Sequence, residues 1–311
     1  WFEHEILGSS YTEDLASQKI KDIRDITLED LNGIDAVIHL AAVSNDPMGK
    51  EFAIPTKQIN LEASIKIINY CKQKAVKKFV FASSCSVYGA GGILPKAEID
   101  EIKPITEYAI SKIEFENYLK QFSNNSDIQI SCLRFGTAAG PSPRIRLDLV
   151  LNDFVTSALT KKEITILSNG DPLRPIIDIE DMSRALYWSL NRSGDNFEIF
   201  NVGLNKNNMS VLELAETVKS IIPSIKISVN KNAAPDKRSY RVNFDKFNSS
   251  LSSDLHLKHD IPSIVKRLVY QLENHTNKLQ NFRDSSFIRL NKLKMLKKSG
   301  LLDINLRKKL V

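Results

Sequence analysis

One apolar run that ends in hydroxyl-bearing side chains restricts the fold more than any other stretch. Residues 79–82 read Phe-Val-Phe-Ala and lead directly into Ser83 and Ser84. Such a run is typical of a strand that is buried on both faces of a parallel sheet. A similar short run covers residues 36–42, and apolar residues at helical spacing cover residues 56–74 between the two. This alternation predicts an α/β fold with a mostly parallel sheet that binds ligands at the carboxyl ends of its strands.

Tyr108 and Lys112 stand four residues apart, the spacing that puts two side chains on one face of a helix. An ammonium beside a phenol stabilises the phenolate, and a free tyrosine, with a pKa of about 10, needs such help to act as a base. Taken alone, such a pair is more often a solvated helix face. The hydroxyl cluster upstream favours the catalytic interpretation.

Several motifs in a fixed order point to a known family. Residues 79–89 read as a strand followed by Ser-Ser-x-x-Val-Tyr-Gly, and residues 108–112 read Tyr-x-x-x-Lys. This order resembles the extended short-chain dehydrogenase/reductase family and, more narrowly, its nucleotide-sugar epimerases and dehydratases. The resemblance runs from about Asp22 to about Tyr240. It implies a Rossmann-like sheet with a smaller C-terminal substrate-binding lobe, NAD or NADP as cofactor, a nucleotide-sugar substrate and a homodimer.

The resemblance implies catalytic roles for Ser84, Tyr108 and Lys112. Tyr108 would take a proton from a sugar hydroxyl, Lys112 would hold the cofactor ribose, and Ser84 would hydrogen-bond the reacting oxygen. Cys85 and Ser86 stand where the 4,6-dehydratases of the family carry Asp-Glu, so the sequence argues against that reaction. An epimerase is the leading interpretation. The alternatives are a reductase of a 4-keto sugar and a non-catalytic binding protein of the same fold.

The same resemblance implies contacts with the cofactor. An Asp-Ile pair at a strand end lies beside the adenine in the family and corresponds to Asp22 and Ile23, for which surface charges at a strand end are the alternative. Asn60 would brace the active-site strands, unless it is an exposed helix residue. We interpret His39 as a packed strand residue. The full set of cofactor residues is Asp22, Ile23, Leu40, Ala41, Ala42, Asn60, Ser83, Tyr108, Lys112 and Phe135.

Five residues are implied to contact the substrate, and Ser84 is one of them. Thr137 stands where many epimerases of the family have an Asn. Arg174 opens a segment similar to Arg-Asp-x-Ile-x-Val-x-Asp, whose Arg binds the substrate diphosphate through paired hydrogen bonds. Arg238 is a second phosphate-binding candidate, with a surface-loop arginine as the alternative. Asn152 lies where a loop enters a helix.

Composition and charge bound the class of protein. The chain has 311 residues, of which 42% are hydrophobic and 26% charged, as in soluble globular proteins. No apolar run approaches the roughly 18 residues of a membrane span. Three widely spaced cysteines indicate reduced thiols and a cytoplasmic location. The net charge of +6 comes without interleaved aromatic residues, so no nucleic-acid partner is expected.

The resemblance also divides the chain. We expect an NAD(P)-binding domain at residues 1–141 and 176–203, and a substrate-binding lobe at residues 142–175 and 204–311. From about residue 261 the chain is basic and helical, and we interpret this part as a solvated extension. Asp181 is expected to cap the helix that follows it.

The glycines do not form the phosphate-binding turn of a dinucleotide fold. The chain opens with Trp1, and its twelve glycines contain no G-x-G-x-x-G. We therefore interpret the sequence as starting after the second strand of such a unit, and we expect weak binding of NAD(P). His256 and His259 have no carboxylate or cysteine partner in the sequence pattern, so no metal site is predicted.

Overall fold

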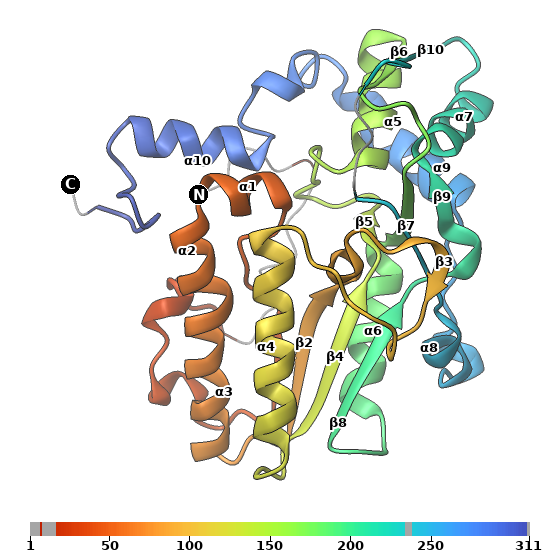
Figure 1. Cartoon of the computed structure of the whole chain (residues 1–311). Helices are drawn as coiled ribbons and strands as arrows, with labels where there is room; N and C mark the ends of the chain where they lie inside the picture. The colour runs from red at the N-terminus through yellow and green to blue at the C-terminus, as the bar shows by residue number, and fades with distance from the viewer. Residues whose placement is uncertain (1–6, 8–16, 234–237, 310–311) are drawn as a thin grey trace.

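A four-stranded parallel sheet forms the centre of the computed structural model, which describes residue 7 and residues 17–233 and 238–309. The strands lie in the order β1-β2-β4-β8, and Figure 1 shows β2, β4 and β8 side by side. Their bounds are Ala36–His39 (β1), Lys78–Ser84 (β2), Gln129–Phe135 (β4) and Phe197–Val202 (β8). In the register, Ser84 lies opposite Phe135, and Phe135 lies opposite Val202. These three strands therefore end at the same edge, and the predicted parallel α/β fold is confirmed.

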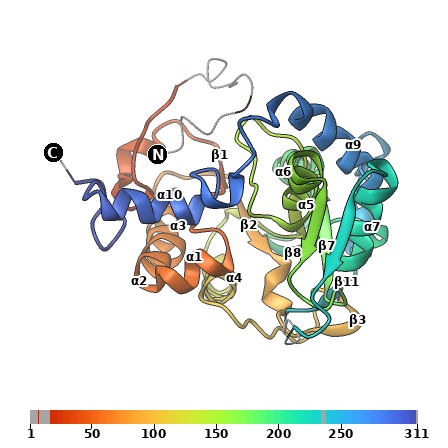
Figure 2. The ribbon, with the colours of Figure 1, turned by 90° about the horizontal axis from the view of Figure 1, so that it is seen from above.

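Alternating side chains on the strands bury two different faces of the sheet. Phe79 and Phe81 pack on one face against helices α3 (Ala63–Gln73) and α4 (Glu107–Ser123). Val80, between them, packs on the other face, together with Trp188 of α6 (Ile179–Asn191). Side chains alternate across a strand, so β2 contributes to both cores and is apolar throughout, as a central parallel strand requires. Figure 2 shows α3 and α4 together on one side of these strands and α6 on the other.

Local signals account for two of the helices. Helix α4 starts where the side chain of Thr106 accepts a hydrogen bond from the Ala109 backbone N–H at 3.2 Å. The helix predicted at residues 56–74 is present, in three consecutive pieces: α2 (Ala53–Lys57), a π-helical turn (Gln58–Glu62) and α3. The π-helical turn carries Asn60, and such single turns often occur at functional sites.

Two expectations about strand and helix ends are wrong. No strand precedes Asp22 among the described residues; it caps a short 3₁₀ turn, Ile23–Asp25, by accepting from the Arg24 backbone N–H at 2.9 Å. The cap of α6 is Asp178, which accepts from the Glu180 N–H at 2.8 Å. Asp181 is buried and accepts backbone N–H groups from a distant loop instead.

A second hydrophobic core lies beyond the carboxyl edge of the main sheet. It joins helices α5 (Val150–Lys161), α7 (Val211–Ile221) and α9 (Ile261–Leu272). Small sheets surround it, with the orders β5-β7-β9, β6-β10 and β3-β11. Their strands are β3 (Gly92–Lys96), β5 (Thr137–Ala139), β6 (Glu163–Ile166), β7 (Leu173–Asp178), β9 (Asn208–Ser210), β10 (Lys226–Val229) and β11 (Tyr240–Val242).

The segment from residue 261 is not simply a solvated extension. Helix α9 buries Ile264, Val265 and Leu268 completely in the second core. Its apolar residues recur at helical spacing; of the two basic residues between them, Lys266 is exposed and Arg267 is half-buried. The expectation relied on the basic residues and overlooked this stripe. Helix α10 (Arg289–Lys298), further along, has no buried residue.

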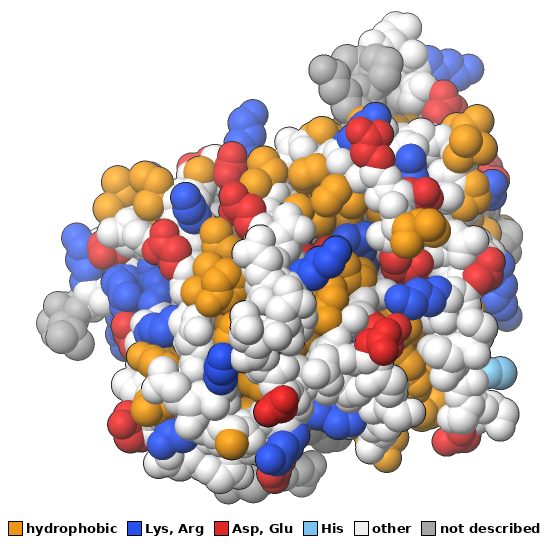
Figure 3. Space-filling model, turned by 60° about the horizontal axis from the view of Figure 1, so that its bottom comes forward, with side chains coloured by type: hydrophobic (Ala, Val, Ile, Leu, Met, Phe, Trp, Pro, Cys, Tyr) orange, Lys and Arg blue, Asp and Glu red, His pale blue; other side chains and the backbone are white. Residues whose placement is uncertain are grey.

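The C-terminal segment crosses back to the start of the described chain. Figures 1 and 2 both place α10 beside α1 (Asp46–Glu51). Phe52, Leu302 and Leu306 form a small hydrophobic cluster there, and Lys294 pairs with Glu51 at 3.1 Å. The remaining helix is α8 (Asp245–Ser249), and no helix in the described ranges is long and apolar enough to cross a membrane. On the face in Figure 3, basic and acidic side chains are interspersed.

Candidate functional site

The structure brings Ser84, Tyr108 and Lys112 together at the carboxyl end of β2. Ser84 is the last residue of the strand, and its hydroxyl lies close enough to Tyr108 to lower the pKa of the phenol. The Lys112 Nζ lies 5.6 Å from the centroid of the Tyr108 ring and donates to the Ala82 carbonyl at 2.7 Å. One strand end and the first turns of one helix thus bring the three side chains close to one another.

Burial raises the pKa of Tyr108, and two neighbours act against that effect. The hydrogen bond from Ser84 lowers the pKa, and so does the positive charge of Arg146. The helical spacing predicts this charge from Lys112, but the leading charge effect comes from Arg146, 38 residues further along the chain. No local spacing connects Arg146 to Tyr108, so the sequence carried no signal for this electrostatic effect.

Arg146 also ties the loop after β1 to the loop before α5. Its guanidinium donates two hydrogen bonds of 2.7 Å to Asp148 and one of 3.1 Å to the Ser44 hydroxyl. Asn45 donates to the same carboxylate at 2.6 Å. Burial alone would raise the pKa of Asp148, but the Arg146 guanidinium holds it below its usual range. The charge near Tyr108 is therefore fixed in place from both loops.

Asn152 is predicted to contact substrate, but its side-chain amide hydrogen-bonds the backbone. Its oxygen accepts from the Gly140 N–H at 3.1 Å, and its nitrogen donates to the Arg146 carbonyl at 2.9 Å. The side chain is 2% exposed. Both functions of the amide therefore go into shaping the loop that carries Arg146, and a direct contact with substrate is not visible in this geometry.

The two predicted phosphate-binding arginines are neighbours. The Arg174 guanidinium donates to the Arg238 carbonyl oxygen, and Arg238 pairs with Asp46 at 3.1 Å. Asp46 also accepts from the hydroxyl of Thr106, the N-cap of α4, at 2.7 Å. Through these contacts, both arginines are connected to the helix that carries Tyr108. Residues 235–237, part of the same predicted segment, lie outside the described residues.

Asn60 connects the loop after β1 to helix α4. It is 2% exposed, accepts from the Val43 N–H at 2.8 Å and donates to the Ser111 hydroxyl at 3.1 Å. The loop after β1 is thereby tied to the helical turn of Tyr108, and the alternative of an exposed helix residue is excluded. Leu40 and Ala41, at the start of that loop, are exposed and Ala42 is half-buried.

His39 is a packed strand residue, as expected. Its ring lies 2.7 Å from the Ser64 hydroxyl and stacks on Phe81 with centroids 6.0 Å apart. Burial lowers the pKa of His39 to about 3. A neutral, enclosed imidazole is a poor candidate for a proton carrier near neutrality.

Two predicted cofactor residues point their side chains into the protein rather than into the site. Ser83 donates to Glu116 and is 4% exposed, and Phe135 packs in the core on the α6 side of the sheet. Side chains alternate across a strand, so the neighbours of Ser84 and Gly136 must point inward. Only the backbone of these two residues is available to a ligand. Thr137 is half-buried in β5, opposite Ile176.

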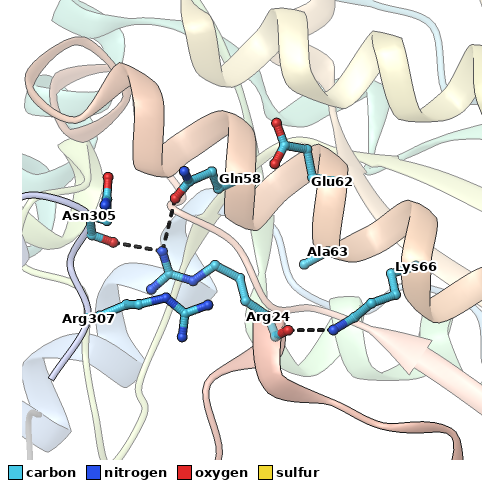
Figure 4. A pocket seen from close by; sticks show the side chains of 7 residues that line it. All are labelled: Arg24, Gln58, Glu62, Ala63, Lys66, Asn305 and Arg307. Carbon is cyan, nitrogen blue, oxygen red and sulfur yellow. Dashed lines mark hydrogen bonds between the residues drawn. The ribbon is translucent and has the colours of Figure 1, made fainter.

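The predicted adenine side is built differently. Asp22 is bound by the Arg24 guanidinium through hydrogen bonds of 2.9 and 2.6 Å, which lower the pKa of the carboxyl. Arg24 also donates to the Asn305 carbonyl at 2.7 Å and to Gln58 at 3.2 Å (Figure 4). A cavity of about 310 Å³ opens beside it. The lining residues are Arg24, Gln58, Glu62, Ala63, Lys66, Asn305 and Arg307.

His259 does have carboxylate neighbours, which the sequence pattern did not reveal. Ligand atoms of Asp178, Glu180 and His259 lie within 4.8 Å of one another. Arg267 reaches the same place, 2.8 Å from Asp178 and 3.0 Å from Glu180. A guanidinium thus already supplies the positive charge that balances these carboxylates, and we interpret the cluster as an ion network between α6 and α9.

Sequence comparison relates this chain to known enzymes. A family model described as "NAD dependent epimerase/dehydratase family" matches residues 13–203, more than half of the chain. The UDP-glucuronate 4-epimerase of Thermodesulfobacterium geofontis is 28% identical over 196 residues, which cover 63% of this chain and 59% of that protein. The dTDP-4-dehydro-6-deoxyglucose reductase of Escherichia coli is 28% identical over 226 residues, covering 72% and 67%.

A solved structure has the same fold. The UDP-glucuronic acid 4-epimerase of Bacillus cereus, in complex with UDP-glucuronic acid and NAD, superposes with a TM-score of 0.72 at 24% identity, covering 82% of this chain and 81% of that one. The chain spans 59 to 65% of the lengths of three curated relatives that it matches.

Proposed function

We propose that this chain, which belongs to the NAD dependent epimerase/dehydratase family, epimerises a nucleotide-activated sugar. Ser84, Tyr108 and Lys112 are its catalytic residues in this proposal. One observation carries it: the Lys112 ammonium lies 5.6 Å from the centroid of the Tyr108 ring, and the Ser84 hydroxyl lies close enough to lower the pKa of the same phenol. A phenol, a hydroxyl and an ammonium in contact are the groups that proton transfer at a sugar hydroxyl requires.

Each of these side chains has a chemical task. Tyr108 takes the proton of a sugar hydroxyl, and the neighbouring positive charges of Lys112 and Arg146 stabilise its phenolate. Ser84 donates a hydrogen bond to the oxygen as it becomes a carbonyl. The nicotinamide cofactor, when bound, supplies the acceptor and donor of the hydride. The configuration would change when the carbon regains hydride on its opposite face, and Tyr108 then returns the proton to the oxygen.

The residues present fit NAD(P) at the nicotinamide side. An ammonium has three donors, and the structure gives Lys112 one acceptor, the Ala82 carbonyl, so donors are left for ribose hydroxyls. The small side chains of Ala41 and Ala42 allow a ligand to approach the backbone after β1. At the adenine side, Asp22 and Ile23 are proposed contacts, although the Asp22 carboxylate is already bound by Arg24. The pairing of Asp22 with Arg24 supports weak binding of NAD(P).

Substrate contacts are proposed for Ser84, Thr137, Arg174 and Arg238. Arg174 and Arg238 are joined to Asp46, close to the start of α4, which supports a diphosphate site next to Tyr108. Asn152 is proposed as a positioning residue for this loop. UDP-sugars are the first substrates to test, because the Thermodesulfobacterium geofontis and Bacillus cereus relatives are named for UDP-glucuronate.

Reduction of a 4-keto sugar is the second candidate. The match to the Escherichia coli reductase supports it, since that match covers 72% of the chain. A 4,6-dehydratase is disfavoured because Cys85 is completely buried and donates to the Arg134 carbonyl at 3.1 Å, and burial raises the pKa of its thiol. Such a thiol cannot replace the carboxylate acid that expels water.

Three further features belong to the same proposal. The division into an NAD(P)-binding domain and a substrate-binding lobe is supported by the separate hydrophobic cores on either side of the carboxyl edge. A cytoplasmic location is supported by the free thiols of the three cysteines. A homodimer is supported by the family resemblance, and light scattering on the purified chain tests it.

A product assay tests the proposed function. The chain is incubated with millimolar NAD and UDP-glucose or UDP-glucuronate, and the sugars are analysed by proton NMR. We expect the 4-epimer without net formation of NADH. A 4-keto-6-deoxy product, or tight substrate binding without turnover, would contradict the proposal. Calorimetry on the same sample should give an NAD dissociation constant weaker than micromolar, because the Asp22 carboxylate at the adenine side is already bound by Arg24.

A further inference from the structure

A buried ion pair lies directly behind the proposed catalytic residues. Arg134 of β4 donates to the Glu116 carboxylate of α4 through its Nε at 3.1 and 3.2 Å and through its Nη2 at 2.7 Å. The two side chains are 4% and 2% exposed. An enclosed pair of this kind gains little stability over apolar residues of the same size, so a task beyond stability is the natural explanation for it.

Glu116 lies next to two of the proposed catalytic residues. Glu116 follows Lys112 by one helical turn on the same face of α4. It also accepts the hydroxyl of Ser83, the residue just before Ser84. One carboxylate therefore touches both the helix that carries Lys112 and the strand end that carries Ser84.

Arg134 extends the network to the rest of the sheet edge. Its Nη1 donates to the Tyr88 hydroxyl at 3.0 Å, and that hydroxyl lies 2.8 Å from the Asn201 amide oxygen of β8. Strands β2, β4 and β8 and helix α4 thus meet in one set of hydrogen bonds. The orientation of the Glu116 carboxylate is fixed from several sides.

We propose that Glu116 and Arg134 form a positioning pair, which holds the Ser83–Ser84 strand end and the Lys112 turn of α4 in their working arrangement. The inference rests on the proposed function, because it takes Ser84 and Lys112 as catalytic. It adds two residues that the motif Tyr-x-x-x-Lys does not include.

The charges around Lys112 support this role. Burial lowers the pKa of Lys112 to about 8, and the Glu116 charge raises it. The other titratable groups that face Lys112 are His39 of β1, Cys132 of β4 and Tyr108 of its own helix.

Burial keeps these three groups neutral near pH 7. It lowers the pKa of His39 to about 3, and it raises the pKa values of Cys132 and Tyr108. Among the described groups around Lys112, Glu116 is therefore the one that supplies negative charge.

Titration of Lys112 by NMR tests the pair without cofactor or substrate. The chain is labelled with lysine carrying ¹³C at Cε, and the Lys112 signal is assigned by its loss in Lys112→Arg. In Glu116→Gln the midpoint of Lys112 should fall by about one pH unit, because a nearby opposite charge is removed. Glu114→Gln is the matched control: the same change on the same helix, at an exposed position, should leave the midpoint in place.

Two more variants keep the test decisive. Glu116→Asp retains the charge and should restore most of the wild-type midpoint. If Glu116→Gln fails to fold, Glu116→Leu combined with Arg134→Met removes the pair without leaving an unpaired buried charge, and the midpoint should still fall. An unchanged midpoint in either folded charge-removing variant overturns the proposal. A lowered midpoint in a chain that turns over no nucleotide sugar would refute the proposed function and leave the pair's effect on Lys112 standing.

Discussion

The two ends of the proposed cofactor site differ in how they are built. At the catalytic end, Tyr108 and Lys112 come from one helix and Ser84 from the strand beside it, and Lys112 is 3% exposed. At the adenine end, Asp22 is held by its near neighbour Arg24, and Arg24 in turn bonds to Asn305, 281 residues away. The first end is enclosed by the sheet core, and the second is closed by a segment from the other terminus.

The two ends also differ in how strongly burial affects their charged groups. At the catalytic end, burial dominates: it lowers the pKa of Lys112 to about 8 and that of His39 to about 3. At the adenine end, Arg24 is 7% and Asp22 29% exposed, and the second pair is more open, with Arg307 41% and its partner Asp25 52% exposed in their side chains. Water and salt screen such pairs, so each contributes little. Changes at the catalytic end should therefore have the larger effects.

The largest effect is expected from Tyr108→Phe. Removal of the phenol leaves no group in its place to accept the proton, and kcat should fall by about 10³-fold, in the range found for general acid–base groups. Proton NMR of samples quenched at fixed times would measure epimer formation and so this fall in kcat. Tyr187→Phe, an exposed tyrosine on α6, is the control and should leave kcat unchanged. A Tyr108→Phe enzyme with near wild-type kcat would contradict the assignment of the catalytic end.

An intermediate effect is expected from His39→Asn on acid stability. The folded state holds the pKa of His39 at about 3, against an ordinary value of about 6.5, so the unfolded chain takes up this proton first. Stability from this residue is complete above about pH 6.5 and is lost as the pH falls toward 3, by up to about 1.4 kcal/mol per pH unit. Urea unfolding between pH 7 and pH 4 should show a shallower loss in the variant.

Exposed His256 provides the comparison for this measurement. His256→Asn should keep the wild-type dependence on pH. An equal slope in wild type and His39→Asn would mean that the imidazole is not enclosed, and the contrast between the two ends would weaken.

The smallest effect is expected from Arg24→Met at the adenine end. The change removes the bonds to Asp22, Gln58 and the Asn305 carbonyl, and should cost about 1–2 kcal/mol of unfolding free energy. Hydrogen exchange of residues 299–309 should become faster. Arg307→Met, which breaks a more exposed pair, should cost less than about 1 kcal/mol. A larger loss from Arg307→Met than from Arg24→Met would reverse this order.

Local patterns were sufficient for much of the fold and for part of the site. The run at residues 79–82 and the spacing of Tyr108 and Lys112 predicted strand β2, helix α4 and the contact of their side chains. Apolar periodicity and alternation express burial directly, so these elements could be read without tertiary information. The same reasoning failed at Asp181, since an acidic residue three positions into a helix resembles a cap and here serves a distant loop instead.

The sequence by itself determined the parallel α/β class and the candidate reactive side chains, because both were inferred from short local patterns. Only the tertiary structure decided which charges surround them. Arg146 reaches Tyr108 from a different loop, and Arg134 meets Glu116 from a neighbouring strand. Electrostatic effects act through space over several ångströms, and separation along the chain carries no information about such distances.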